Sequence, residues 1–198
     1  MKSAPFKYFQ PRELAEVYNL LALNGDEARI IAGGQSLTPM MSMRLVRPSL
    51  LIDINEINSL YGSTVENNQL IIKANTRQSW LEQSALINKC CPLLKKALPH
   101  IGHLQIRNRG TLGGSIAHAD PAAEIPLIIT TLRGGILLSN SKSERIVTAD
   151  NFFVSALTTA IEPEECLLLV KLPIWDKDFL GTSFQEVSIR RGDFALIS

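Results

Sequence analysis

The sequence predicts an α+β fold in which a small βαβ lobe is followed by a larger lobe with mostly antiparallel strands. Two observations lead to this prediction. Residues 28–54 contain an apolar strand segment, a turn with two glycines, a short helical segment and a second apolar strand segment, which is the order of a βαβ unit. Beyond residue 57, short strand segments lie in pairs around turn residues, as in antiparallel hairpins.

The small lobe is predicted element by element from local signals. Residues 11–24 carry apolar side chains at helical spacing and are followed by a glycine, which is a common helix stop. Residues 28–32 are the first predicted strand. Thr38 and Pro39 then predict the start of a short helix, with the threonine as N-cap and the proline at the first helical position. Residues 49–54 are the second predicted strand.

The larger lobe carries hairpin and helix signals. Asn67 and Asn68, at the centre of residues 64–74, predict a β-hairpin. Residues 122–132 fit a helix or a buried strand by pattern alone, and the Asp-Pro pair before them favours the helix. Further helices are expected at residues 76–88 and 92–98. Further strands are expected at residues 134–140, 143–149 and 166–174.

The composition argues against several classes of function. A net charge of +1, with no stripe of lysine or arginine, gives no basis for nucleic-acid binding. No apolar stretch approaches the ~20 residues of a membrane span, and the N-terminus lacks the apolar core of a secretory signal. The three cysteines form no C-x-x-C motif, so no metal or iron–sulfur site is expected in this chain. We therefore expect a cytoplasmic protein.

Two glycine pairs, each followed within two residues by a serine, are the candidate binding motifs. Gly33-Gly34 lies in "IAGGQSLTPMM" and Gly113-Gly114 lies in "RGTLGGSIAHADP". Glycine lets backbone N–H groups approach and surround an anion, so two such turns could hold a pyrophosphate without a lysine. The competing interpretation is two ordinary tight turns. Neither G-x-G-x-x-G nor G-x-x-x-x-G-K-[ST] is present, and Asp53 is interpreted as a strand-end residue.

Three segments in register resemble the FAD-binding medium subunit of molybdenum hydroxylases, the carbon monoxide dehydrogenase and xanthine dehydrogenase type. They are "AGGQSLTPMMSMRLVRPSLLIDIN", "IRNRGTLGGSIAHADPAAEIP" and "RRGDFA". The resemblance implies the two-lobed flavin domain of the p-cresol methylhydroxylase and vanillyl-alcohol oxidase class. It also implies that both glycine segments clasp the FAD pyrophosphate and ribityl chain between the lobes.

The resemblance also implies a set of cofactor-binding residues. Asp120 competes with Glu124 for the role of an acidic contact, and Arg107 and Arg109 are either phosphate contacts or exposed charges. No catalytic side chain and no metal ligand is expected. The implied FAD-binding residues are Ile30, Ile31, Ala32, Gly33, Gly34, Gln35, Ser36, Leu37, Ile101, Thr111, Leu112, Gly113, Gly114, Ser115, Glu124 and Leu167.

The implied function is electron transfer. In this family an iron–sulfur small subunit passes electrons from a molybdenum-cofactor large subunit to the flavin, which delivers them to an external acceptor. We expect residues 1–175 to form the FAD-binding domain, with lobes at about 1–56 and 57–175. Residues 176–198 would then begin a C-terminal domain that is truncated here. The alternative is a truncated, non-catalytic remnant or assembly module.

Overall fold

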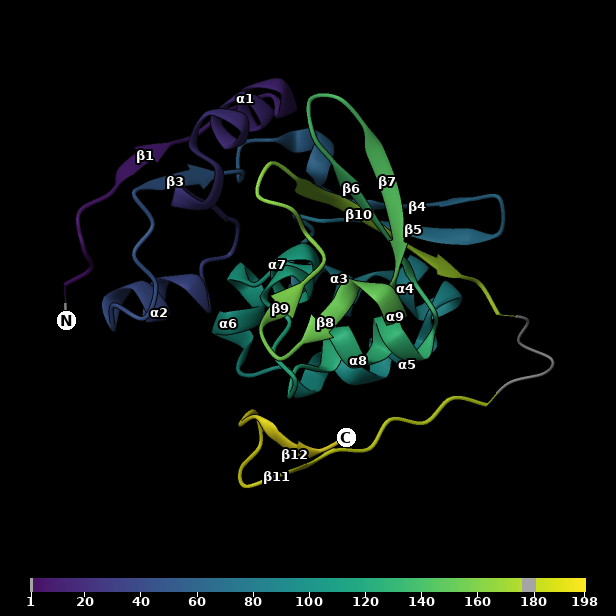
Figure 1. Cartoon of the computed structure of the whole chain (residues 1–198). Coiled ribbons are helices and arrows are strands. Elements are labelled where there is room, and N and C mark those ends of the chain that lie inside the picture. Colours follow the sequence, from purple (N-terminus) through teal and green to yellow (C-terminus); the bar gives the residue numbers. More distant parts are fainter. Residues whose placement is uncertain (1, 176–180) are drawn as a thin grey trace.

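The computed structural model describes residues 2–175 and 181–198 and consists of two lobes and a C-terminal hairpin (Figure 1). The small lobe contains a three-stranded parallel sheet in the order β1-β3-β2. Its elements are β1 (Lys7–Phe9), α1 (Leu14–Asn24), η1 (Gly25–Glu27), β2 (Ala28–Ile31), α2 (Leu37–Ser42), β3 (Leu50–Asp53) and η2 (Asn58–Leu60).

The parallel register of the small sheet brings three strand ends together. Phe9 of β1 pairs with Ile52, and Ile31 of β2 pairs with Asp53 of β3, so the carboxyl ends of all three strands meet at one edge. The central strand β3 is buried along its whole length, as its run of apolar residues predicts. The first glycine turn leaves β2 at this edge, the place where ligands bind in open sheets of parallel strands.

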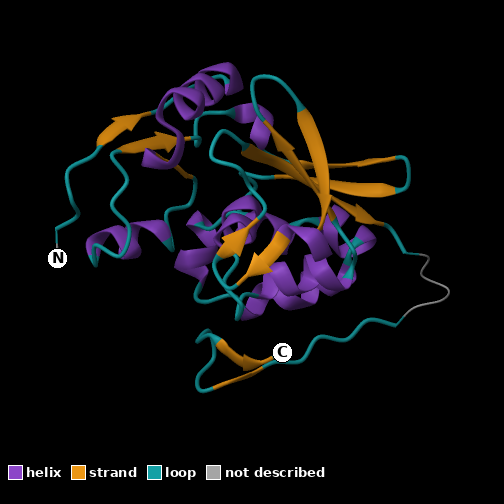
Figure 2. Cartoon of the chain, in the orientation of Figure 1, coloured by secondary structure: helices purple, strands orange, loops and turns teal. Residues whose placement is uncertain are grey.

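The larger lobe is built on a five-stranded antiparallel sheet in the order β4-β5-β10-β6-β7. Most of the helices of this lobe gather on one side of the sheet (Figure 2). Its strands are β4 (Ser63–Glu66), β5 (Gln69–Lys73), β6 (Gly135–Ser139), β7 (Glu144–Thr148) and β10 (Cys166–Pro173), with a separate pair, β8 (Phe153–Ser155) and β9 (Thr158–Thr159). Its helices are α3 (Gln78–Gln83), α4 (Ala85–Cys90), α5 (Pro92–Ala97), η3 (Leu98–His100), α6 (Leu104–Arg109), α7 (Leu112–His118), α8 (Glu124–Thr131) and α9 (Ala149–Phe152).

Strand β10 joins the two lobes because it contributes to both hydrophobic cores. Cys166 and Leu168 pack in the core of the small lobe, whereas Leu167 and Val170 pack in the core of the larger lobe. The register of β10 against β6 shifts between Leu167 and Leu169. The shift marks a bulge, which changes the direction of neighbouring side chains. One strand thereby fixes how the lobes sit against each other.

Most predicted elements are present, and two predictions needed correction. The helix predicted to start after Thr38 begins at Leu37, since the Thr38 N–H already donates to the Gly34 carbonyl at 3.1 Å. The helix predicted over residues 76–88 is interrupted at Ser84, whose hydroxyl accepts from the Ile87 N–H and caps α4. The helix of residues 122–132 is confirmed as α8. Strand β1 and helices α6 and α7 were not predicted.

The C-terminal segment contains the strand pair β11 (Val187–Ser188) and β12 (Ala195–Ile197) and lies near α5, η3 and α6. The Phe184 ring packs edge-on against the His100 ring, with 5.0 Å between the ring centroids. The Lys96 ammonium donates to the carbonyl of Thr182. The hairpin itself exposes several apolar side chains, among them Phe194 and Leu196.

Candidate functional site

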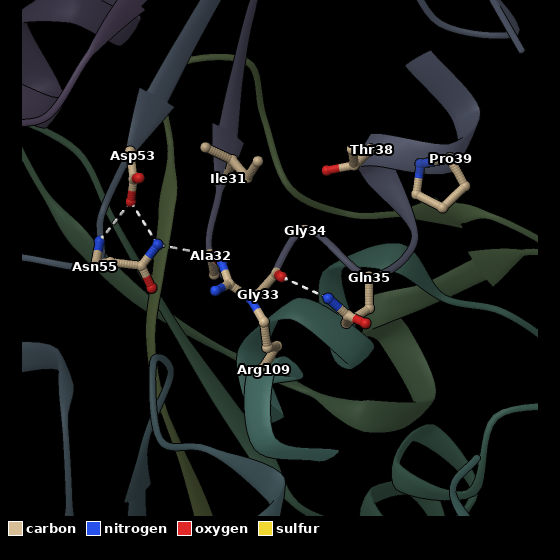
Figure 3. A pocket seen from close by; sticks show the side chains of 10 residues that line it. All are labelled: Ile31, Ala32, Gly33, Gly34, Gln35, Thr38, Pro39, Asp53, Asn55 and Arg109. Atoms are coloured by element: carbon tan, nitrogen blue, oxygen red, sulfur yellow. Dashed lines mark hydrogen bonds between the residues drawn. The ribbon is translucent and has the colours of Figure 1, made fainter. Parts of the chain in front are cut away.

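A cavity of about 400 Å³ lies at the carboxyl edge of the small sheet (Figure 3). The first glycine turn forms one wall, the end of β3 forms a second, and the end of α6 in the larger lobe closes the third. The cavity is therefore shared between the lobes. Its lining residues are Ile31, Ala32, Gly33, Gly34, Gln35, Thr38, Pro39, Asp53, Asn55 and Arg109.

The first glycine turn presents unused backbone donors. Within the described chain, the N–H groups of residues 33–36 donate to no backbone or side-chain acceptor. Gly34 has a φ of 71°, a left-handed conformation that favours glycine. The Gln35 side chain folds back and donates to the Gly33 carbonyl at 3.0 Å. A turn with several free N–H groups beside a cavity is a site for an anion.

The larger lobe packs so closely against Gly33 that a side chain would not fit at this position. A Cβ atom at this position would lie 2.3 Å from the Arg109 carbonyl oxygen and 2.9 Å from the Cα of Gly110. The start of the second glycine segment therefore packs directly on the first. The sequence-based prediction that the two segments meet between the lobes agrees with this contact.

The second glycine segment differs from the first in how its donors are used. The Leu112 N–H donates to the Thr76 carbonyl at 3.0 Å, and the Gly113 N–H donates to the Ala74 carbonyl at 2.8 Å. The Gly114 N–H donates to the hydroxyl of Thr111, which caps α7. These donors are used within the protein, so the expectation that both turns offer free N–H groups holds for the first turn only.

The start of the second glycine segment is buried because it packs against the end of β5. A Cβ atom on Gly113 would lie 2.7 Å from the Cβ of Ala74, so this glycine allows α7 to pack against the end of β5. Thr111, Leu112 and Gly113 are buried, whereas Gly114 is exposed and Ser115 is half-buried. Contact with a ligand by this segment remains a prediction, and Gly114 and Ser115 are its accessible members.

Sequence reasoning missed a polar network beside the cavity. The Tyr8 hydroxyl donates to Asp53, and this hydrogen bond is the main reason why the pKa of Tyr8 rises to about 12. Asn55 donates to Asp53 through its backbone N–H at 2.8 Å and through its side-chain amide at 2.6 Å (Figure 3). The same amide donates to the Ala32 carbonyl at 2.9 Å, and its oxygen accepts from Arg77 at 2.6 Å.

The signal for this network in the sequence is faint. Asp53 stands at the end of an apolar strand, as predicted, but nothing in the local pattern marks Asn55 or Arg77. Both are single polar residues that lie 22 positions apart and meet only in the folded chain.

The two arginines considered as phosphate contacts lie in different environments. Arg107 is buried and its guanidinium pairs with Glu82 at 2.8 Å while donating to the Ile101 carbonyl at 2.9 Å. Its charge is thus balanced inside the protein. Arg109 is exposed, lines the cavity, and extends toward Ala32 (Figure 3). Arg109 is therefore the arginine placed to contact an anion there.

The remaining predicted residues lie outside the lining of this cavity. Ile30 lies within β2, Ser36 precedes α2, and Leu37 is the first residue of α2. Ile101 packs at the edge of the larger core, and Leu167 lies within that core. Glu124 is buried at the start of α8, where burial raises the pKa of its carboxyl group to about 7. Asp120 accepts from the Ala122 N–H at 2.9 Å, so it stabilises the turn before the helix.

The part of the chain that the structure describes, residues 2–175 and 181–198, contains no group of three His, Cys, Asp or Glu residues arranged to hold a metal ion. It also contains no helix with the length and apolar character needed to cross a membrane.

Comparison with known proteins identifies the class to which this fold and site belong. Residues 4–175 match the family described as the FAD binding domain in molybdopterin dehydrogenase, and the chain belongs to this family. It is 37% identical over 196 residues to the caffeine dehydrogenase subunit beta of Pseudomonas sp. strain CBB1, a match that covers 98% of this chain and 66% of that protein. The carbon monoxide dehydrogenase medium chain of Hydrogenophaga pseudoflava is 34% identical, over 96% of this chain and 66% of its own length.

Solved structures confirm the predicted two-lobed α+β FAD-binding fold. The carbon monoxide dehydrogenase of Hydrogenophaga pseudoflava superposes with a TM-score of 0.95 at 34% identity, over 98% of this chain and 68% of the matched chain. Quinoline 2-oxidoreductase of Pseudomonas putida 86 gives a TM-score of 0.95 at 39% identity, over 99% and 67%. The chain thus spans about two thirds of the length of the relatives that it matches.

The residues at the cavity fit the cofactor of this family. The pyrophosphate of FAD carries negative charge, and the cavity offers it the free N–H groups of residues 33–36 and the guanidinium of Arg109. Gly33 and Gly34 place no side chain between these donors and the ligand. The first glycine turn and Arg109 would therefore hold the pyrophosphate.

Proposed function

We propose that this chain is the FAD-binding, electron-transfer subunit of a molybdenum-containing hydroxylase complex. In such a complex it would work with an iron–sulfur small subunit and a molybdenum-cofactor large subunit, in the cytoplasm. FAD, when bound, supplies the capacity to accept electrons from the clusters and to pass them to an external acceptor. The observation that carries the proposal is the turn with free N–H groups at a cavity between the lobes.

The residues of this chain bind and orient the cofactor in this proposal. The free N–H groups of residues 33–36 and the Arg109 guanidinium hold the pyrophosphate. Gly114 and Ser115 are the accessible residues of the second segment, and the Ser115 hydroxyl is the donor that they offer. Glu124 remains a proposed polar contact from α8, and Ile101 and Leu167 remain proposed apolar contacts. No side chain is assigned to acid–base chemistry.

The domain boundaries are part of the proposal. Residues 1–175 would form the FAD-binding domain, in lobes of about 1–56 and 57–175, and residues 176–198 would belong to a further domain. The family match over residues 4–175 supports the first boundary. The exposed apolar side chains of the β11–β12 hairpin support the second, because such side chains are usually covered by other parts of a protein.

Binding of FAD to the purified full chain tests the proposal. The wild-type chain should show flavin absorption bands after purification or after incubation with FAD, and ADP should compete for the same site because it carries the same pyrophosphate. A chain that binds neither FAD nor ADP would contradict the proposal. Electron transfer is tested separately, by reduction of the bound flavin after the iron–sulfur and molybdenum subunits are added.

A charge variant tests the assignment of the cavity. Arg109→Ala should raise the dissociation constant of ADP about two- to fivefold, as expected for one exposed charge contact of up to ~1 kcal/mol. Arg12→Ala is the matched control, since Arg12 is an exposed arginine of the small lobe that is not among the residues lining the cavity. Equal ADP affinity in the two variants would show that Arg109 does not contact the anion.

A further inference from the structure

Arg77 connects the two lobes beside the proposed pyrophosphate site. It immediately precedes α3 in the larger lobe, is half-buried, and its backbone pairs with Thr111 of the second glycine segment. One terminal nitrogen, Nη2, donates to the side-chain oxygen of Asn55 at 2.6 Å. The other, Nη1, donates to the carbonyl of Arg109. Both terminal nitrogens thus have acceptors within the protein.

Asn55 links Arg77 to the first glycine turn. Its amide nitrogen donates to the carbonyl of Ala32, the residue before Gly33, at 2.9 Å. The same nitrogen and the backbone N–H donate to Asp53 at the end of β3. The side chain of Asn55 is therefore held on three sides, and its orientation fixes the point at which the turn leaves β2.

The Arg109 carbonyl links Arg77 to the same turn from the opposite side. It faces the position where Gly33 would carry a Cβ atom, which would be only 2.3 Å away. Arg77 thus contacts both supports of the turn: Asn55, which holds Ala32, and the Arg109 carbonyl, against which Gly33 packs.

We propose that Arg77 is a positioning residue that holds the free N–H groups of residues 33–36 in the geometry that binds the pyrophosphate of a dinucleotide. The proposal rests on the proposed function, since it assigns a role to the same site. Arg77 acts through Asn55 and the Arg109 carbonyl, and it is not among the residues that line the cavity, so the proposal assigns it no direct contact with the ligand.

The chemistry of the arginine side chain distinguishes positioning from a simple effect of charge. A planar guanidinium can donate to two acceptors at a fixed separation, whereas a lysine ammonium is a point charge on a flexible stem. If Arg77 worked by attracting the anion, Arg77→Lys would preserve binding. If it works as a two-pronged support, Arg77→Lys should lose much of the effect that Arg77→Ala loses.

ADP titration of the full chain tests the proposal. Arg77→Ala should raise the dissociation constant of ADP about fivefold or more. The fold increase caused by Arg77→Lys should be at least half as large as that caused by Arg77→Ala. Asn55→Ala should also weaken binding. When Arg77→Ala and Asn55→Ala are combined, the fold increase in the dissociation constant of ADP should be clearly smaller than the product of the two single increases, because the residues act through one shared contact. Arg12→Ala should bind as the wild type does.

Backbone dynamics of the ligand-free chain give a readout that does not require binding. The amides of Gly33 and Gly34 should have NMR order parameters typical of a rigid backbone, about 0.85, in the wild type, and lower values in both Arg77 variants. Far-UV circular dichroism and the melting temperature establish that each variant is folded.

The outcomes separate this proposal from the one on which it rests. If the wild type binds ADP and Arg77→Lys binds equally well with an equally rigid turn, the positioning role is wrong while FAD binding stands. Multiplicative effects in the double variant would also contradict it. If the wild type binds neither ADP nor FAD, the proposed function fails, and the positioning role for a dinucleotide fails with it.

Discussion

The contact between Gly33 and the Arg109 carbonyl predicts that the smallest possible side chain at this position destabilises the protein. The φ angle of Gly33 is outside the left-handed region, so alanine fits the backbone and the effect of Gly33→Ala is purely steric. The new Cβ atom would meet the Arg109 oxygen at 2.3 Å, whereas ordinary contact begins at 3.4 Å. The two segments must therefore separate by about 1 Å, and the neighbouring atoms are backbone.

The size of the effect follows from the cost of overpacking. Forcing an extra carbon atom into a packed contact costs about 1–3 kcal/mol. In a chain of this length, each 1 kcal/mol lowers the melting temperature by about 2–4 °C, so Gly33→Ala should melt about 2–12 °C below the wild type. The shift also moves the Arg109 carbonyl, an acceptor of Arg77, so ADP binding should weaken as well.

Thermal unfolding measured by circular dichroism is the assay, with Gly181→Ala as the control. Gly181 is exposed, its φ angle is also outside the left-handed region, and a Cβ atom there would have no neighbour within 4 Å among the residues that the structure describes. This variant should therefore melt within about 2 °C of the wild type. A wild-type melting temperature and ADP affinity in Gly33→Ala would refute the close contact between the two glycine segments.

Two further predictions follow from buried titratable groups. Because burial raises the pKa of Glu124 to about 7, the folded chain holds a proton that the unfolded chain has lost between about pH 4.5 and 7. The ligand-free wild type should thus lose about 2–3 kcal/mol of stability over this range, measured by urea unfolding, and Glu124→Gln should not. Burial also raises the pKa of Cys91 to about 11 and that of Cys166 to about 12. Iodoacetamide at pH 8 should therefore label half-buried Cys90 in the native protein and all three thiols only after unfolding, as read by mass spectrometry. A wild-type pH profile in Glu124→Gln, or native labelling of Cys166, would contradict these assignments.

Local signals were sufficient for much of the fold. The apolar runs of β3 and β10, the Asn-Asn turn between β4 and β5, and the Asp-Pro pair before α8 each depend on neighbouring residues only. Helix α7 could not be found in this way, because its first turn is stabilised by carbonyls of Ala74 and Thr76, which lie almost 40 residues earlier in the chain. Strand β1 is three residues long, and all three are exposed, so its sequence carries no burial pattern.

Part of the candidate site was also predictable from local signals in the sequence. Glycine pairs followed by a small polar residue are visible in the sequence, and the prediction that they meet between two lobes agrees with the contact of Gly33 with Arg109. What each glycine does was not visible. Gly34 has a left-handed φ angle. At Gly33 a side chain would clash with the backbone of Arg109 and Gly110, and at Gly113 it would clash with Ala74. These reasons depend on tertiary contacts, and so do the roles proposed for Asn55 and Arg77.

The difference between the two glycine segments defines how the site works. A backbone N–H group can donate to a ligand or to the protein, and the second segment has already donated to Ala74 and Thr76. Those bonds hold α7 against β5 and thereby hold the start of the segment, at Arg109, against the first turn. The first turn keeps its donors free and in turn needs supports from outside, which Asn55 and Arg77 supply. In the proposed site the first glycine turn would be the anion-binding surface and the second segment its support. Loss of the first turn should then weaken dinucleotide binding through lost donors, and loss of the second segment should weaken it through lost alignment of the first.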